Sequence, residues 1–496
     1  MTVVTRVAAW VCVSLLPSNG STREFSAPVE ETVQVRAHPG AAGKSWRRVA
    51  VAALPDGLGY AAHSIPGGGD GSESRNELWR FTDTHLGQAQ GRVRIALSNA
   101  QDSRGEGEWA AIFGGGHGLV AGGARLFVVF IDRGVDGWDT GDFVSITTGV
   151  RAPVDDTETP ASNGLGEPAL VDTDLDGSAD LAYAGDLLGN LYRFDISGSD
   201  PSSWRAVRLF QAGYGGPPSV RQPIAERPFV VRHPGQGGFL VVFGTGRGPP
   251  AEDPAGTDIQ SIYGIWDPGG PDPATAGPRA KGERLVGRSL VNLVDESSGS
   301  FETRRVLTGE PVRYARDAPG RRGVYGWYID LDMPRARQTL QGNPNPDRCG
   351  GAPPDAQYPG ERVAGRPIPR GNLLFMATVI PRDTPHCAAA PPGSVLAIDM
   401  VTGGSAGTAV LDLNDDGHIG RDDLVPFDGG TAASGIVLDG TAFSGVPCEP
   451  ELVSGRDGSA ILVVGEGGDA LSLSIGSAGK PRTGRLSWRE IPVEGP

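Results

Sequence analysis

Short apolar runs separated by glycine, proline and aspartate recur along the whole chain, and they limit its fold more than any other feature. Clear examples are residues 125–131, 238–243, 372–379 and 460–465. Runs of about four to eight apolar residues that end in Gly or Asp are typical of strands inside a sheet. Long helical patterns are nearly absent, and 76 Gly and 41 Pro among 496 residues supply the turns. The chain is therefore predicted to be all-β, as a sandwich or a propeller.

The strand pattern predicts one large domain over residues 28–496 rather than several. All-β propellers often run long as single domains, with four-stranded blades around a central axis that leave only short edges exposed. Two stretches rich in Pro, Gly and charge, residues 268–321 and 332–371, are predicted to be long loop insertions outside the sheet core. Residues 54–69 are predicted to be a loop.

Residues 1–27 fit two interpretations. Arg6 followed by the apolar run 7–16 resembles a secretory signal peptide, and that run is too short to span a bilayer. The alternative is a leader left at a fragment boundary, with the apolar run forming a buried strand. Since no other segment could span a membrane, any membrane association is expected to come through partners.

Composition and motifs argue against several functions. With 44 Lys and Arg against 59 Asp and Glu, the net charge is −15, which disfavours binding to nucleic acid. No Cys-x-x-Cys or His-Glu-x-x-His motif is present. Three cysteines, Cys349, Cys387 and Cys448, allow three pairings that each leave one free.

The first of two acidic loops has the ligand spacing of a calcium site. Carboxylates stand at its positions 1, 3, 5 and 9, a glycine at position 6 permits a sharp turn, and the carbonyl of position 7 adds a neutral oxygen. Four carboxylates this close repel one another without a cation, so an empty loop should be loose. The predicted ligands are Asp172, Asp174, Asp176, Ser178 and Asp180.

The second acidic loop matches an EF-hand calcium loop, with Asp in place of Glu at position 12. Asp reaches less far, so bidentate closure is weaker and lower affinity is expected. Position 7 calls for a backbone oxygen, so the His418 side chain is expected to face solvent. The predicted ligands are Asp412, Asn414, Asp416, His418 (through its carbonyl) and Asp423.

Several blocks in order resemble the PilC/PilY family of type IV pilus-tip adhesin and biogenesis proteins. The segment 166–195, which holds the first acidic loop, is very similar to the calcium-loop region of that family. Shorter blocks resemble its W-x-x-x-F-G-N-G, F-G-T-G-R, S-x-Y-G-I-W-D, G-W-Y-x-D-L and S-W-R-E motifs. These blocks are residues 109–116, 243–247, 260–267, 326–331 and 484–490. The resemblance extends over residues 46–490.

The resemblance implies a modified, quinoprotein-like β-propeller of seven blades with bound Ca²⁺ and no enzymatic activity. It implies an extracytoplasmic location at the cell surface, the pilus tip or the outer membrane. Pilin or minor pilins and a host or abiotic surface are the implied partners. The implied roles are pilus assembly that opposes retraction, twitching motility and adhesion.

Two other functions use a similar fold. Quinoprotein dehydrogenases are calcium-bearing propellers, but many carry adjacent cysteines beside the quinone and this chain has none. Absorbance of a bound quinone would identify that class. Integrin-like or lectin-like calcium propellers share the D-x-D-x-D-G-x-x-D loop, although the blocks beyond the loop favour the pilus family. Glycan binding without association with pilins would favour this third class.

Overall fold

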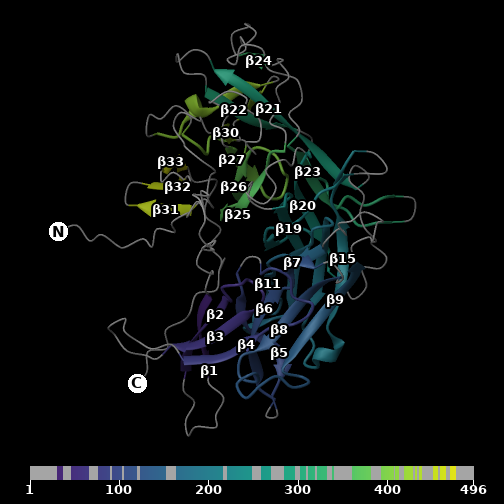
Figure 1. Ribbon diagram of the computed structural model, residues 1–496. Coiled ribbons are helices and arrows are strands. Elements are labelled where there is room, and N and C mark those ends of the chain that lie inside the picture. Colours follow the sequence, from purple (N-terminus) through teal and green to yellow (C-terminus); the bar gives the residue numbers. More distant parts are fainter. Residues whose placement is uncertain are drawn as a thin grey trace, which may run out of the picture.

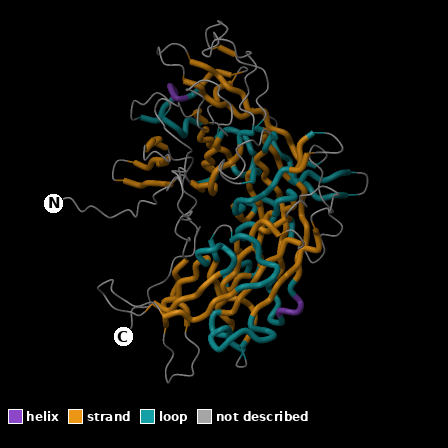
Figure 2. Tube along the Cα trace, viewed as in Figure 1, coloured by secondary structure: helices purple, strands orange, loops and turns teal. Residues whose placement is uncertain are grey.

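The computed structural model describes a large part of the chain, with gaps at many loops. The described residues are 31–36, 46–65, 76–89, 92–102, 105–119, 123–151, 163–215, 220–247, 258–269, 284–295, 302–308, 311–318, 321–331, 338–339, 360–380, 393–406, 408–412, 418–427, 430–432, 435–437, 451–455, 458–464 and 470–475. Strands dominate this part, and its helices are the short 3₁₀ turns η1 (Pro201–Ser203) and η3 (Arg421–Asp423) (Figure 2).

The sheets follow one another along a curved array in the order of the sequence (Figure 1). The first sheet pairs neighbours in order: β1 (Glu31–Arg36), β2 (Trp46–Ala53), β3 (Tyr60–Ile65) and β4 (Asn76–Phe81). The second has the order β12 (Ser178–Ala179), β5 (Arg94–Gln101), β6 (Gly107–Gly114), β8 (Gly123–Phe130) and β9 (Phe143–Arg151). The third has the order β11 (Ala169–Val171), β13 (Leu181–Gly185), β14 (Asn190–Asp195) and β15 (Arg205–Gln211).

The second half of the array is one sheet of 11 strands. Its path runs β18 (Phe229–Arg232), β19 (Phe239–Gly244), β20 (Ser261–Asp267), β23 (Gly326–Asp330), β21 (Leu285–Asp295), β22 (Glu302–Thr308), β30 (Gly435–Val437), β27 (Gly393–Asp399), β26 (Leu373–Val379) and β25 (Arg362–Arg370), and β24 (Gln338–Thr339) pairs with β21. Three smaller sheets have two strands each: β7 (Gly116–Leu119) with β10 (Asn163–Leu165), β16 (Gly213–Tyr214) with β17 (Val220–Arg221), and β28 (Val425–Phe427) with β29 (Gly430–Ala432). A further sheet has the order β31 (Glu451–Gly455), β32 (Gly458–Val464) and β33 (Ala470–Ile475).

Alternate residues of a single strand enter two different hydrophobic cores. On β8, Leu126 and Val128 pack in a core shared with the third sheet, whereas Phe127 and Val129 pack in a core shared with the first sheet. Successive side chains of a strand point to opposite faces, so a strand buried on both faces reads as a continuous apolar run. The same alternation on β19 sends Leu240 into one core and Val241 into another. The apolar runs of the sequence are therefore strands sandwiched between neighbouring sheets.

All four apolar runs form strands, as predicted, and they correspond to β8, β19, β26 and β32. Three other predictions are wrong. The stretches 268–321 and 332–371 are not outside the sheet core, because the first contributes β21 and β22 to the 11-stranded sheet and the second contributes β25. Val306 of β22 is completely buried and Val363 of β25 is 5 % exposed. Residues 54–69 include β3, whose Tyr60 is 2 % exposed. In each place polar residues between the apolar ones hid the strand pattern.

Only some of the sheets have the four strands predicted for each propeller blade. The first and third sheets have four strands, but the second has five and the last sheet is continuous over 11. Its continuity comes from a parallel pairing of β21 with β23, which joins what would otherwise be separate antiparallel units.

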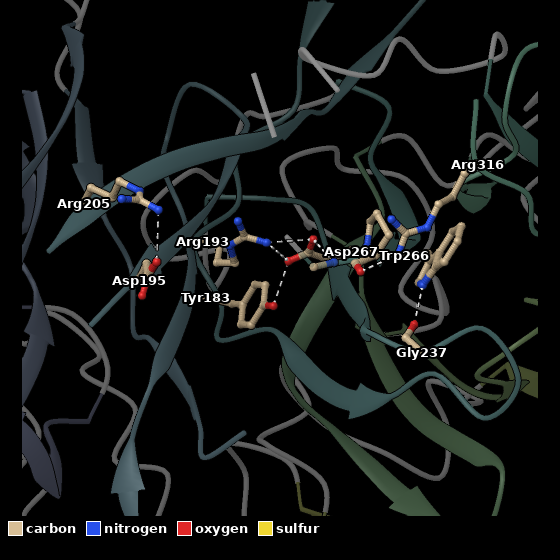
Figure 3. A network of polar contacts seen from close by, with 10 residues as sticks. Tyr183, Arg193, Asp195, Arg205, Gly237, Trp266, Asp267 and Arg316 are labelled. Atoms are coloured by element: carbon tan, nitrogen blue, oxygen red, sulfur yellow. Dashed lines mark hydrogen bonds and ion pairs between the residues drawn. The ribbon is translucent and has the colours of Figure 1, made fainter. Parts of the chain in front are cut away.

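A buried ion pair links the third sheet to the 11-stranded sheet (Figure 3). Arg193 of β14 donates from Nη1 to both carboxylate oxygens of Asp267, the last residue of β20, at 3.0 and 2.9 Å. Tyr183 of β13 donates its hydroxyl to the same carboxylate at 2.9 Å. The Arg193 and Asp267 side chains are 5 % and 2 % exposed. Burial and the neighbouring Asp267 carboxylate raise the pKa of Tyr183 well above its usual value, so this hydroxyl remains a donor at neutral pH.

We expect Asp267→Ala to lower the free energy of unfolding by about 3–5 kcal/mol, because it leaves a buried guanidinium without its counter-ion. The matched control is Arg205→Ala, which breaks the exposed Arg205–Asp195 pair of the same sheet, 3.4 Å long. That change should cost at most about 1 kcal/mol. Chemical denaturation of the two variants measures the difference, and equal losses would contradict this account of the junction.

Candidate metal centre

The first acidic loop occupies the connection between β11 and β13, two antiparallel neighbours of the third sheet. The backbone N–H of Asp180 donates to the Val171 carbonyl at 2.9 Å and closes the base of the loop. Gly177 has φ 106°, a conformation that favours glycine, so the predicted turn residue stands where the turn requires it. Leu175 also has a positive φ of 69° and is 75 % exposed. The backbone thus wraps tightly around the acidic side chains.

The carboxylates of Asp172, Asp174 and Asp176 converge, and their nearest oxygens all lie within 4.8 Å of one another. Backbone N–H groups of the loop orient them: Asp172 accepts from Leu175 at 2.5 Å and from Gly177 at 2.9 Å. Asp174 accepts from the N–H of Asp176 at 3.2 Å. Each bond occupies one lone pair, and a carboxylate oxygen has two. This cluster offers hard oxygen donors with free lone pairs, and that donor chemistry fits calcium.

Asp180 lies apart from that cluster and is 5 % exposed. Its Oδ2 accepts hydrogen bonds from the N–H and the hydroxyl of Thr173, at 2.7 and 2.5 Å. Its Oδ1 accepts one from the side-chain amide of Asn99 at 2.9 Å, which leaves that oxygen one lone pair. The carboxylate therefore ties the end of the loop to its beginning, and its direct ligation of a metal stays a prediction. Ser178, which is predicted to bind the metal through its carbonyl, is buried and begins the two-residue strand β12.

Residues of two other sheets hold this loop, and no pattern in the sequence points to them. Asn99 belongs to β5, and β12 pairs in parallel with β5 through Ser178 and Ala179. On the other side, Arg232 of β18 donates from Nη2 to the Thr173 carbonyl. Asn99 lies 81 residues from its partner Asp180, and no local spacing signals a contact over that separation.

The second acidic loop is described only at its two ends. Asp412 and Asp423 are 8 % and 1 % exposed, and Asp423 Oδ2 accepts the N–H of Gly420 at 2.8 Å. His418 is exposed. Asn414 and Asp416 lie outside the described residues, as do Cys349, Cys387 and Cys448 and the segment 1–27. Among the described residues, the acidic cluster of the first loop is the one group of side chains whose geometry could hold a metal ion.

A curved array of sheets packed face to face defines a β-propeller, and comparison with known proteins agrees. Residues 103–297 match the model of the PilY1 beta-propeller domain. The crystal structure of the Pseudomonas aeruginosa PilY1 C-terminal domain superposes with a TM-score of 0.65 at 23 % identity, over 91 % of this chain and 83 % of that one. The predicted propeller class is confirmed, whereas the number of blades stays a prediction.

Relatives in sequence carry the same family name. A type IV pilus biogenesis factor PilY1 homolog of Xylella fastidiosa is 31 % identical over 376 residues, which are 73 % of this chain and 22 % of the relative. A second homolog of that organism is 30 % identical over 90 % of this chain and 30 % of its own length. Type IV pilus biogenesis factor PilY1 of Pseudomonas aeruginosa is 26 % identical over 68 % of this chain and 28 % of its own length.

This chain belongs to the PilY1 family, and the similarity lies in the β-propeller domain. It spans less than a third of the length of these relatives. No helix in the described part of the chain is long and apolar enough to cross a membrane.

In the absence of calcium, we expect two acids of the loop to affect stability in opposite ways. Asp180→Ala should lower the free energy of unfolding by about 1–3 kcal/mol, because Thr173 and Asn99 lose their acceptor. Asp174 is exposed and repels its neighbours, so Asp174→Ala should leave stability unchanged or raise it slightly. Denaturation in excess chelator compares the two. A larger loss for Asp174→Ala would refute the assigned roles.

Proposed function

We propose that this chain is a calcium-binding, non-enzymatic propeller that acts in type IV pilus biogenesis at the cell surface or pilus tip. Pilin or minor pilins are its proposed partners, with a host or abiotic surface as a further one. In this role it supports pilus assembly by opposing retraction, and thereby twitching motility and adhesion. The observation that carries the metal part is the convergence of Asp172, Asp174 and Asp176 within 4.8 Å. The relatives named as pilus biogenesis factors carry the cellular part.

Calcium is the cation that best fits this donor set. Oxygen donors exclude metals that prefer sulfur or nitrogen, and Mg²⁺ demands near-octahedral geometry and keeps most of its water. A nine-residue loop with three converging carboxylates suits the six to eight oxygens of calcium better. The Ser178 carbonyl and the remaining lone pair of Asp180 Oδ1 complete the proposed set of protein ligands.

Asp176→Ala tests the link between this site and piliation. It removes one ligand and should weaken calcium binding by tenfold or more, with a modest loss of global stability because the hydrophobic cores lie elsewhere. Cells that carry it should lose surface pili or twitching, and a block of retraction should restore the pili. Titration calorimetry and counts of pili measure the two effects.

The matched control is Asp136→Ala, an exposed acid in a turn without ligand spacing. It should change neither calcium affinity nor piliation. Unchanged affinity in Asp176→Ala would remove the metal site. Normal piliation and motility despite lost affinity would instead remove the proposed role in the cell.

The second loop is proposed to hold another, weaker calcium through Asp412, Asn414, Asp416, the His418 carbonyl and Asp423. Extracellular calcium modules bind at about 10⁻⁴–10⁻³ M, so the site would be filled outside the cell. Metal analysis at millimolar calcium should find two ions per chain, and Asp416→Ala should reduce the number to one. A single ion in the unmodified protein would count against the second site.

A further inference from the structure

The acidic loop connects two strands of the third sheet, and it is also held by contacts to the second sheet and to the 11-stranded sheet. Its second half forms β12, which pairs in parallel with β5 of the second sheet through Ser178↔Leu97 and Ala179↔Ser98. Its first half carries Thr173, whose carbonyl accepts a hydrogen bond from the guanidinium of Arg232. Arg232 belongs to β18 of the 11-stranded sheet. The loop therefore lies at a junction of three sheets.

The side-chain amide of Asn99 contacts both the loop and the strand behind it. Its side-chain Nδ2 lies 2.9 Å from Asp180 Oδ1, 3.1 Å from the Ala179 carbonyl and 3.3 Å from the Ile196 carbonyl. The first two partners belong to the loop, and the third follows β14. One amide of the second sheet thus fixes the end of the loop and the strand behind it. Asp180 in turn accepts two hydrogen bonds from Thr173, so the end of the loop is joined to its beginning.

We propose that Asn99 is a positioning residue for the acidic loop, and that cation binding at Asp172, Asp174 and Asp176 is thereby coupled to the junction between the second and third sheets. The inference rests on the calcium site proposed above. Groups that orient metal ligands without touching the metal typically change affinity by about 10–100-fold when they are removed. Coupling is reciprocal, so a junction that raises affinity for the ion must itself be stabilised by the ion.

Asn99→Ala is the primary test, with Ser98→Ala as its matched control. Ser98 is the next residue on the same strand, and its hydroxyl donates to the Glu108 carbonyl at 2.8 Å, inside the second sheet and away from the loop side chains. Titration calorimetry with calcium chloride on the full chain should show affinity about tenfold or more weaker for Asn99→Ala. The affinity of Ser98→Ala should stay within about twofold of the unmodified protein.

Arg232→Gln provides a second variant, because Arg232 is exposed and its replacement should not impair folding. It should also weaken binding, since the Thr173 carbonyl loses its guanidinium partner. Hydrogen exchange with and without calcium gives an independent readout. Calcium should slow exchange at β5 and β18 as well as in the loop, and in Asn99→Ala the effect at β5 should disappear.

Each outcome decides a separate question. Absence of calcium binding by the unmodified protein would remove the proposed metal site and this inference with it. Binding that is unaffected by Asn99→Ala would overturn the inference and leave the metal site intact. Slowed exchange confined to residues 172–180 would also overturn the coupling. Weaker binding in Asn99→Ala but not in Ser98→Ala, with calcium slowing exchange at β5, would support it.

Discussion

Burial of both faces of each central strand is the constraint on which the architecture depends. On β6, Ala110 and Ile112 enter the core shared with the third sheet, while Ala111 and Phe113 enter the core shared with the first. A sheet in that position is held by its neighbours on either side, so each junction between sheets is also a hydrophobic core. Hydrophobic burial is non-directional, and it does not by itself fix how one sheet is placed on the next.

Buried polar contacts at the junctions supply the missing direction. Glu167, 4 % exposed, accepts the N–H of Arg92 at 2.8 Å, lies 2.5 Å from Arg366 Nη2 and lies 3.6 Å from Arg227 Nε. Arg92 precedes β5 and Arg366 belongs to β25, so this carboxylate joins distant parts of the array. Arg305 and Glu361 form a pair that is fully buried within the 11-stranded sheet. A buried charge without a partner is costly in free energy. The sheets are therefore restricted to arrangements in which these buried charges are paired.

The sequence predicts features that depend on neighbours along the chain and fails for those that depend on distant ones. The strand at 125–131 and the turn at Gly177 follow from local residue type, and both are found as predicted. The strands at 285–295 and 302–308 fall in the stretch predicted as an insertion, because residues 268–321 are rich in Pro, Gly and charge. The charge of Arg305 is nevertheless buried, and it pairs with Glu361, which lies 56 residues away. Asn99 and Arg232 escaped notice at the acidic loop for the same reason.

Magnitudes indicate what calcium can do at such a junction. A ligand that binds only the folded state stabilises it by RT ln(1 + [L]/Kd), which is about 1.4 kcal/mol at a concentration ten times Kd. About 1 mM calcium supplies that ratio when Kd is about 10⁻⁴ M, the tight end of the range for extracellular calcium modules. This is less than the about 3–5 kcal/mol expected from one buried ion pair such as Arg193–Asp267. The cores and buried pairs therefore hold the fold, and a cation in the acidic loop has enough free energy to tighten one junction but not to assemble the propeller. A site of that strength is suited to stabilising one packing of neighbouring sheets over another. The contacts of Asn99 and Arg232 with the loop would couple ion binding to that packing.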